Sequence, residues 1–340
     1  MKDYNYVLAI VLVLFKIFTT IKSNYIPIQH PVPIRQQTIQ ESLKDSELND
    51  YQFKGIDKII PPSIPISECM FVTSETGRFT YESTSDDPTV CGAYFITDPD
   101  KRVELFFLSF DVPCEGGGLV SFVDGWELNG EFFPSPEDHS LPLEERVTEF
   151  CGKYVSHTFI SSQNGAVIQY RIPFKGKGFT VIARYRRNPT PCNVLVNSTM
   201  DSFTLRNYGK RINCTLLAIY PSVVQTIDLN VGGRRLEKSL LPYMRHFFLE
   251  KTGTIHQCNK LGLADHVLIG GNTGLDTSKI EVLDSICGSN NKPDSSSQII
   301  GCEVTTVKLV SSGFTDNSVT VFIRPAVEEE ILNSNLICGF

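Results

Sequence analysis

Ten cysteines are spread along this chain of 340 residues, and they constrain its fold more than any other feature of the sequence. None of them lies in a Cys-x-x-Cys or Cys-x-His arrangement, so their spacing indicates neither a zinc site nor a redox motif. In an oxidising compartment, an even number of cysteines is typical of a disulfide framework, which here would contain five bridges. Counting alone leaves about 945 possible pairings open.

The first 23 residues indicate that the chain enters such a compartment. An apolar run from Val7 to Phe15 follows Lys2, and small polar residues lead to Ser23. This run is shorter than the ~20 apolar residues that a membrane-spanning helix needs. We therefore expect residues 1–23 to be a cleaved secretory signal peptide, and the mature chain to be secreted and extracellular without membrane insertion. An N-terminal anchor is the alternative.

The segment that follows, residues 24–66, is polar and broken by prolines, so we expect a flexible leader without a core of its own. The whole chain has a net charge of −7, and removing the signal peptide, with its three lysines and one aspartate, changes this to −9. Such an acidic chain is poorly suited to a polyanion of the nucleic-acid type. We expect no nucleic-acid partner.

From Cys69 onward the sequence has the pattern of an all-β protein. Short runs rich in Val, Ile, Phe and Tyr recur between Gly, Pro, Asn and Asp residues, and each run predicts a strand. The clearest runs are RVELFFLSFDV, AVIQYRI, GFTVIARYR, SVVQTIDLNV, HVLIGG, TTVKLVSS and SVTVFIRP. Segments of helical period are scarce, and Pro242 would break the longest of them, residues 234–251.

The cysteine spacing also indicates an internal repeat. The 22-residue separation of Cys69–Cys91 recurs in Cys192–Cys214, with an offset of 123 residues between the two pairs. In each half a second pair of cysteines follows, and the later member of that pair precedes a glycine. The simplest interpretation is two copies of one β-rich unit, a first domain at 67–190 and a second at 191–340.

The stretch CEGGGLVSFVDGW, which begins at Cys114, contains three consecutive glycines of the kind found in phosphate-binding loops. A phosphate loop needs its glycines to lead into the N-terminus of a helix, usually with Lys-Ser or Lys-Thr at the end. Here they lead into alternating apolar and polar residues that end in Asp-Gly, which is typical of a half-buried strand followed by a turn. We interpret the stretch as a strand.

The same stretch resembles part of a CUB domain, which is an antiparallel β-sandwich. The matching parts are Cys114, Asp124-Gly125, Phe150-Cys151-Gly152, Ser161-Ser162-Gln163-Asn164 and Gly178-Phe179-Thr180. Longer motifs resemble the corticotropin-releasing factor-binding protein family over roughly residues 60–340. They are DGWELNGEFFPSPEDHSLPLEER, Pro191-Cys192-Asn193-Val194, Arg211-Ile212-Asn213-Cys214, Ile219-Tyr220-Pro221 and GGNTGLDTSKI. The resemblance implies an all-β fold of two tandem CUB-like antiparallel β-sandwich (jelly-roll) domains, stapled by disulfides.

The resemblance also implies which cysteines pair and where a glycan lies. Consecutive cysteines pair in the family, so the expected bridges are Cys69–Cys91, Cys114–Cys151, Cys192–Cys214, Cys258–Cys287 and Cys302–Cys338. Asn213 lies in a sequon at the position of the family's glycan. Asn197 lies in a second sequon that has only the generic Asn-X-Ser/Thr motif to support it.

The sequence offers little for metal binding or catalysis. Many CUB domains bind calcium through an aspartate, and the resemblance places Gly118 at that position in the first unit. The second unit keeps Asp265, followed by Asp276, for which capping of a turn is the interpretation we favour over a metal site. The sequence contains neither GxSxG nor HExxH, and its six histidines have no metal-ligand spacing. We expect no metal, no other cofactor and no enzymatic activity.

The function that the resemblance implies is the binding of a secreted peptide hormone of the corticotropin-releasing factor class. Departures from the family pattern are typical of a non-vertebrate member, for which a diuretic hormone is the implied ligand. Such peptides form amphipathic helices, so we expect an apolar groove that accepts one helix face. The protein would sequester the hormone and limit its access to receptors. The alternative is an extracellular CUB adhesion or co-receptor module that binds another secreted protein.

Two segments are candidates for the groove. In the family, a basic residue before the first cysteine and an acidic residue after it are implicated in binding, but here Pro65 and Phe71 occupy these positions. The apolar residues that we predict to replace this ionic anchor are Ile64, Ile66, Met70 and Phe71, with a core or linker role as the alternative. The second candidate is the insert at 234–251, where Arg245, Phe247 and Phe248 suit an amphipathic acidic peptide. A surface loop is the alternative there.

Overall fold

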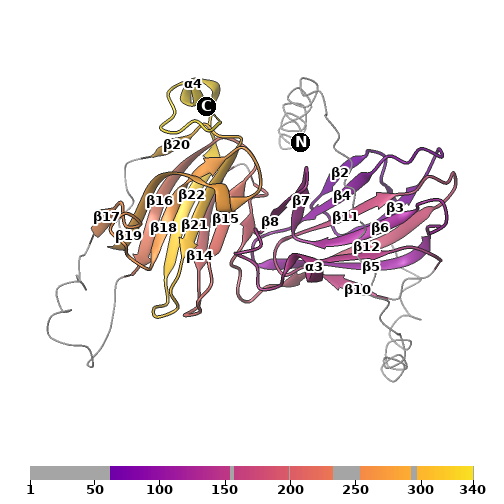
Figure 1. Cartoon of the computed structure of the whole chain (residues 1–340), viewed down its shortest axis with the longest axis horizontal. Coiled ribbons are helices and arrows are strands. Elements are labelled where there is room, and N and C mark those ends of the chain that lie inside the picture. Colours follow the sequence, from indigo (N-terminus) through magenta and orange to yellow (C-terminus); the bar gives the residue numbers. More distant parts are fainter. Residues whose placement is uncertain (1–61, 154–156, 199, 233–252, 292–296, 340) are drawn as a thin grey trace. The chain divides into compact units, whose positions relative to one another are not determined.

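The structure, a computed structural model, describes residues 62–339 except 154–156, 199, 233–252 and 292–296 (Figure 1). Its regular structure is almost entirely β-strand, and each of the seven apolar runs of the sequence contributes to a strand. The strands form two successive, mainly antiparallel β-sandwiches, so the predicted all-β tandem fold is confirmed.

The first sandwich consists of two five-stranded sheets. The first sheet contains, in spatial order, β1 (Ile64–Pro65), β3 (Gly77–Glu82), β12 (Gly178–Arg187), β5 (Lys101–Asp111) and β10 (Thr158–Ile160). The second contains β2 (Met70–Thr73), β4 (Cys91–Ile96), β11 (Gly165–Arg171), β6 (Leu119–Asp124) and β9 (Val147–Phe150). Strand β1 lies within residues 24–66, which were expected to form a leader without a core, and it pairs in parallel with β3.

Alternation along the strands explains how the first sandwich encloses its core. In β12, Phe179, Val181 and Ala183 are buried, whereas Thr180 and Ile182 between them face outward. The inward residues of both sheets form one apolar cluster in which aromatic rings pack edge to face, as Phe79 and Phe95 do at 5.5 Å between ring centroids. The alternating pattern that predicted strands from sequence therefore also separates the buried side chains of β12 from the outward ones.

The second sandwich is built from a single ten-stranded sheet that folds over its own core. Its main path runs through β13 (Val194–Leu195), β15 (Cys214–Ala218), β21 (Val304–Val310), β18 (His266–Asn272), β19 (Glu281–Asn290), β16 (Ser222–Val231), β22 (Ser318–Pro325) and β14 (Asp201–Arg206). Strand β17 (Gly253–His256) pairs with β19, and β20 (Gln298–Ile300) pairs with β16. Because β19 pairs with β18 along its first part and with β16 near its end, it joins the two layers.

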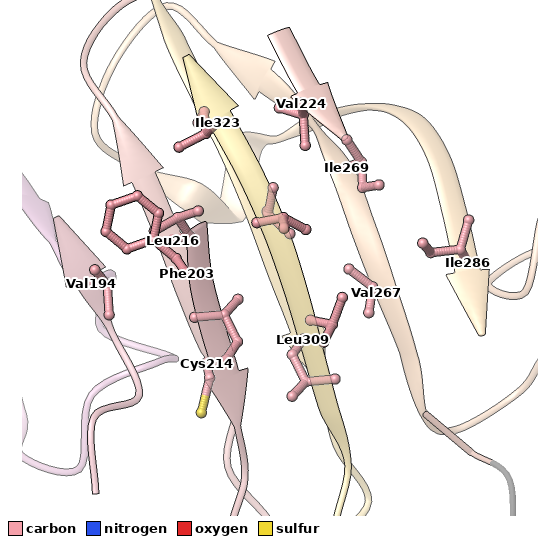
Figure 2. Close-up of a cluster of buried hydrophobic side chains, with 14 of the residues drawn as sticks. Val194, Phe203, Cys214, Leu216, Val224, Val267, Ile269, Ile286, Leu309 and Ile323 are labelled. Atoms are coloured by element: carbon pink, nitrogen blue, oxygen red, sulfur yellow. The ribbon is translucent and has the colours of Figure 1, made fainter. Parts of the chain in front are cut away.

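The core of the second sandwich is apolar and almost fully buried. Figure 2 shows side chains from both layers meeting in it, among them Phe203, Leu216 and Leu309. The other regular elements of the described residues are short: the hairpin β7 (Trp126–Leu128) and β8 (Glu131–Phe133), and the helical segments α3 (Leu143–Arg146), η2 (Thr277–Lys279) and α4 (Glu328–Leu332). These elements lie outside the two cores and carry several of the side chains described next.

Candidate functional site

The edge strand β2 exposes apolar side chains on the surface of the first sandwich. Strand β2 pairs with β4, and its side chains alternate. Phe71 faces inward and packs against the core, with its ring centroid 5.8 Å from that of Phe79. Met70 and Val72 face outward and remain 46% and 51% exposed. Two neighbouring exposed apolar side chains on a sheet edge form a surface that an apolar partner can cover.

A small pocket opens beside Met70. Its volume is about 180 Å³, and it is lined by Met70, Val90, Gly92, Tyr94, Gln169 and the Cys69–Cys91 disulfide. The ring of Tyr94 extends over Gly92, where an added Cβ would lie 2.5 Å from a ring carbon. Glycine at position 92 is thus what allows the tyrosine ring to form one wall of the pocket.

A buried carboxylate lies behind this pocket. Glu127 is 9% exposed, accepts a hydrogen bond from the Gly130 backbone N–H at 2.6 Å, and accepts another from the side-chain amide of Gln169. Burial raises the pKa of Glu127, and burial together with Glu127 raises the pKa of Tyr94 to about 12. Within the described part of the chain, no Lys, Arg or His forms an ion pair with Glu127. Glu127 does not line the pocket itself, but it is hydrogen-bonded to Gln169, which does.

The internal repeat shows what covers the same strand in the second sandwich. Residue 195 lies 123 positions after residue 72, so Leu195 of β13 corresponds to Val72 of β2. Leu195 is only 1% exposed because it packs against Tyr94, Trp126 and other residues of the first sandwich. The first sandwich thus covers strand β13. Among the described residues, the outward face of β2 stays exposed.

The two sandwiches meet through an apolar cluster. The first contributes Tyr94, Ile96, Val123, Trp126, Phe133 and Val167, and the second contributes Leu195, Leu217, Leu275 and Val304. All ten side chains are at most 9% exposed, and the rings of Tyr94 and Trp126 pack in a tilted arrangement with 4.9 Å between their centroids. This buried apolar contact couples the pocket wall formed by Tyr94 to the second sandwich.

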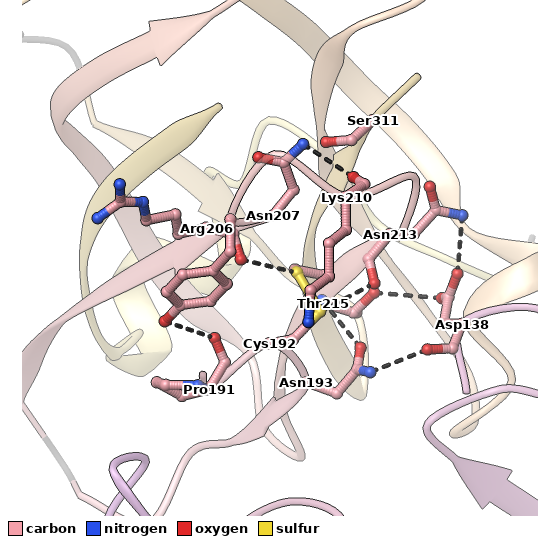
Figure 3. The surroundings of a disulfide bond; sticks show 12 residues. Asp138, Pro191, Cys192, Asn193, Arg206, Asn207, Lys210, Asn213, Thr215 and Ser311 are labelled. Atoms are coloured by element: carbon pink, nitrogen blue, oxygen red, sulfur yellow. Dashed lines mark hydrogen bonds between the residues drawn. A yellow bond between two sulfur atoms is a disulfide. The ribbon is translucent and has the colours of Figure 1, made fainter. Parts of the chain in front are cut away.

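Asp138 extends from the first sandwich into the second and is completely enclosed there (Figure 3). Its carboxylate lies 2.9 Å from the ammonium of Lys308 and accepts hydrogen bonds from the hydroxyls of Thr215 and Thr277 and from the amide of Asn213. Its backbone carbonyl accepts a hydrogen bond from Asn193. A buried carboxylate needs this many donors to offset its loss of hydration.

The residue after Asp138 fastens the same loop to the first sandwich. His139 is buried, with its Nε2 3.5 Å from Oδ2 of Asp124. Asp124 also accepts hydrogen bonds from the backbone and hydroxyl of Ser162. Arg146 is fully buried and donates to the carbonyls of Asp124 and Pro134. The loop that carries Asp138 is therefore held at both ends.

Comparison with known proteins shows what kind of chain has this architecture. The model of the corticotropin-releasing factor binding protein N-terminal domain matches residues 65–187, and the model of the C-terminal domain of that protein matches residues 194–332. The chain belongs to the corticotropin-releasing factor-binding protein family. The human protein of that name is 35% identical over 272 residues, covering 78% of each chain, and that of Xenopus laevis is 34% identical over 255 residues, covering 74% of each.

Similarity to solved structures is more distant. The CUB1-EGF-CUB2 domains of rat MASP-1 are 11% identical and match 75% of this chain and 99% of that one, with a TM-score of 0.24. The full extracellular region of zebrafish Gpr126/Adgrg6 matches 78% of this chain and 38% of that one at 11% identity, with a TM-score of 0.28. With TM-scores this low, the similarities carry no argument about the fold, which is assigned from the strands alone.

The structure separates the residues predicted for peptide binding. Met70 lies on the exposed surface, but Phe71 and Ile64 pack against the core of the first sandwich, and Ile66 is buried within it at 5% exposure. These three side chains therefore support the edge strand and do not line its surface. Arg245, Phe247 and Phe248 lie outside the described residues. Val72, Gln169 and Glu127, which lie at or beside this surface, were not predicted from the sequence, although the 123-residue repeat offset links Val72 to the buried Leu195.

The disulfides of the structure are the five pairs that the family resemblance implies: Cys69–Cys91, Cys114–Cys151, Cys192–Cys214, Cys258–Cys287 and Cys302–Cys338. The two sequons have different surroundings. Asn197 is exposed, whereas Asn213 is half-buried, with its side-chain nitrogen 3.1 Å from Asp138. Glycosylation at either position stays a prediction.

The two aspartates considered for calcium binding accept hydrogen bonds from neighbouring residues. Asp265 accepts hydrogen bonds from Ser312 and Asn317, and Asp276 caps η2 by accepting from Ser278. At Gly118 an added Cβ would lie 2.2 Å from the carbonyl oxygen of Pro113, so the site admits no side chain. The residues that the structure describes contain no group of three or more His, Cys, Asp or Glu side chains that could hold a metal ion.

The lengths of the described helices bear on whether one of them could span a membrane. The longest of them, α4, has five residues, and none of those described is long and apolar enough to cross a bilayer. The residues that predict the signal peptide lie outside the described part of the chain.

Proposed function

We propose that this chain is a secreted, non-enzymatic binding protein that captures a peptide hormone of the corticotropin-releasing factor class. Membership of the family supports this proposal, because the relatives are named for binding corticotropin-releasing factor. A diuretic-hormone-type peptide is the ligand proposed here. The binder acts by mass action: bound hormone cannot reach a receptor, so the free concentration falls.

The observation that carries the site assignment is the exposed edge of the first sandwich. Met70 and Val72 form an apolar surface beside a pocket of about 180 Å³ whose wall is Tyr94. An amphipathic helix presents apolar side chains at i, i+3, i+4 and i+7, so one side chain can enter the pocket while the next turn rests on the two exposed residues. The negative charge of Glu127, which is hydrogen-bonded to Gln169 of the pocket lining, would favour a basic group of the peptide near the pocket.

Titration calorimetry of the purified chain tests the function. The titrants are a synthetic corticotropin-releasing factor-like peptide and a scrambled peptide of the same composition, which controls for non-specific apolar binding. Saturable 1:1 binding of the first peptide alone supports the proposal. Equal heats from both peptides, or none from either, would contradict it and favour an adhesion or co-receptor module.

A further inference from the structure

Four arginines lie on the outward face of the sheet that contains β1, β3, β12, β5 and β10. They are Arg78 on β3, Arg184 and Arg186 on β12, and Arg102 on β5, and we call them the arginine face. Their shared orientation follows from alternation, because Phe79, Val103 and Ala183 next to them point into the core. The strand register places Arg186 directly opposite Arg102, and Arg184 directly opposite the carboxylate of Glu104. Ile182, two residues before Arg184, lies directly opposite Arg78.

Most of this positive charge is not neutralised within the protein. Arg186 pairs with Glu104 at 2.8 Å, and Arg102 donates to the side chain of Asn188 at 3.3 Å. The side chains of Arg78 and Arg184 form neither a hydrogen bond nor an ion pair with any residue that the structure describes. Like charges directly opposite on neighbouring strands destabilise a sheet. Glu104 offsets part of the repulsion between Arg102 and Arg186 by pairing with Arg186, and a negative partner outside the chain would offset more of it.

The geometry of the face suits an extended polymer of negative groups. Residues two apart on a strand are separated by ~7 Å, and residues paired across strands by ~5 Å, so Arg184 and Arg102 both lie close to Arg186. The large cavity on this sheet, about 440 Å³, is lined by residues 107–111 and 178–180 and lies further along the strands, so it does not include the four arginines. Because the arginine face does not line this cavity, it suits a small molecule less well than an extended one.

The chemistry of arginine narrows the choice of polymer. Guanidinium groups stay charged and form paired N–H···O bonds with planar or tetrahedral oxyanions such as carboxylate and sulfate. A chain with net charge −7 repels polyanions in general, so only a concentrated array of this kind can hold one. For a protein that is secreted, as proposed above, the polyanion encountered outside the cell is a sulfated polysaccharide.

We infer that the arginine face binds a sulfated polysaccharide and so retains the protein on the extracellular matrix. The face belongs to the sheet opposite the one that carries Met70 and Val72, so both surfaces can be occupied at once. The hormone-binding role does not depend on this second surface. The inference relies on the proposed secretion but not on the identity of the hormone.

Affinity chromatography of the full chain on immobilised heparin tests the inference. The double variant Arg78→Ser/Arg184→Ser removes two arginines that have no partner among the described residues, so the fold should be retained and circular dichroism will check it. The matched control, Lys210→Ser/Lys260→Ser, removes the same charge from exposed positions of the second sandwich. We expect the arginine variant to bind heparin about tenfold more weakly at low salt, with the control within about twofold of the unaltered chain.

Three results would overturn the inference. The first is equal affinity of the arginine variant and the unaltered chain. The second is equal retention of the unaltered chain on desulfated heparin. The third is displacement by polyglutamate as efficient as displacement by heparin at equal charge, which would assign the face to an acidic protein. Hormone titration of the arginine variant separates the two proposals, because its hormone affinity should be unchanged.

Discussion

Oδ2 of Asp138 lies 2.9 Å from Nζ of Lys308, and both side chains are buried where the two sandwiches meet, with 0% and 6% exposure. The pair connects a loop of the first sandwich to strand β21 of the second, across 170 residues of sequence. Asp138 is held from one side by Thr215, Thr277 and Lys308, while its neighbour His139 contacts Asp124. Two successive residues thus fasten one loop to both halves of the protein.

Replacing Asp138 with Ala should destabilise the protein strongly. The substitution leaves the Lys308 ammonium with only the half-exposed Glu137 as a partner, and breaking a buried ion pair typically costs about 3–5 kcal/mol of unfolding free energy. The control is Asp316→Ala, which breaks an exposed ion pair with Arg206 and should cost at most about 1 kcal/mol. Urea denaturation measures both values. Similar losses for the two variants would show that Asp138 does not fasten the halves.

Asp124 should make the stability depend on pH in the acidic range. Burial raises the pKa of this carboxyl, but the hydrogen bonds from Ser162 and the nearby imidazole of His139 outweigh burial, and its pKa lies below the ordinary value of 3.8. A carboxyl whose pKa is lower in the folded chain than in the unfolded chain stabilises the fold above the unfolded pKa, and this contribution is lost as the pH falls through the folded pKa.

The variant Asp124→Asn therefore should be less stable than the unaltered chain at pH 7, and the difference should shrink as the pH is lowered from about 5 toward 3. Thermal unfolding at a series of pH values measures this difference. Asp98→Asn is the control, because the pKa of Asp98 is also lowered, by Lys101, but the pair is exposed. A difference for Asp124→Asn that stays constant over the pH range would contradict the assignment.

Gly92→Ala should disturb the pocket. The new Cβ would come 2.5 Å from the Tyr94 ring, so the ring must move away from its position over residue 92. Because Tyr94 also packs on Trp126 at the junction, we expect a loss of about 1–3 kcal/mol in stability and weaker hormone binding. At Gly77 an added Cβ meets its nearest neighbours only at 3.9 Å, so Gly77→Ala is the matched control. Unchanged hormone binding by Gly92→Ala would exclude Tyr94 from the site.

The sequence predicted much of the architecture because its signals are local. Alternation in runs such as GFTVIARYR depends only on neighbouring residues, and it predicted the strand β12. The equal spacing of Cys69–Cys91 and Cys192–Cys214 predicted two similar units. Both patterns can be recognised from the sequence because neither depends on how distant segments pack.

The sequence could not predict which side chains of the edge strand are exposed. Met70 and Phe71 are both apolar, and alternation states that they point to opposite sides without stating which side faces the core. The role of Asp138 could not be predicted from the sequence either. Within the segment PSPEDHS it has the pattern of a solvent-exposed turn. Its enclosure depends on Lys308 and Thr277, which only the packing of the two sandwiches brings to it.

The most direct test of the account is hormone binding by the double variant Met70→Ala/Val72→Ala, measured by titration with the same synthetic peptide. Truncating two exposed apolar contacts should weaken binding about tenfold or more, while the fold is retained because neither side chain belongs to the core. The control is Leu261→Ala/Leu332→Ala, which truncates apolar residues that are 63% and 78% exposed on the second sandwich, and it should bind as the unaltered chain does. If the Met70 and Val72 variant binds the hormone with unchanged affinity, the edge of the first sandwich is not the hormone site.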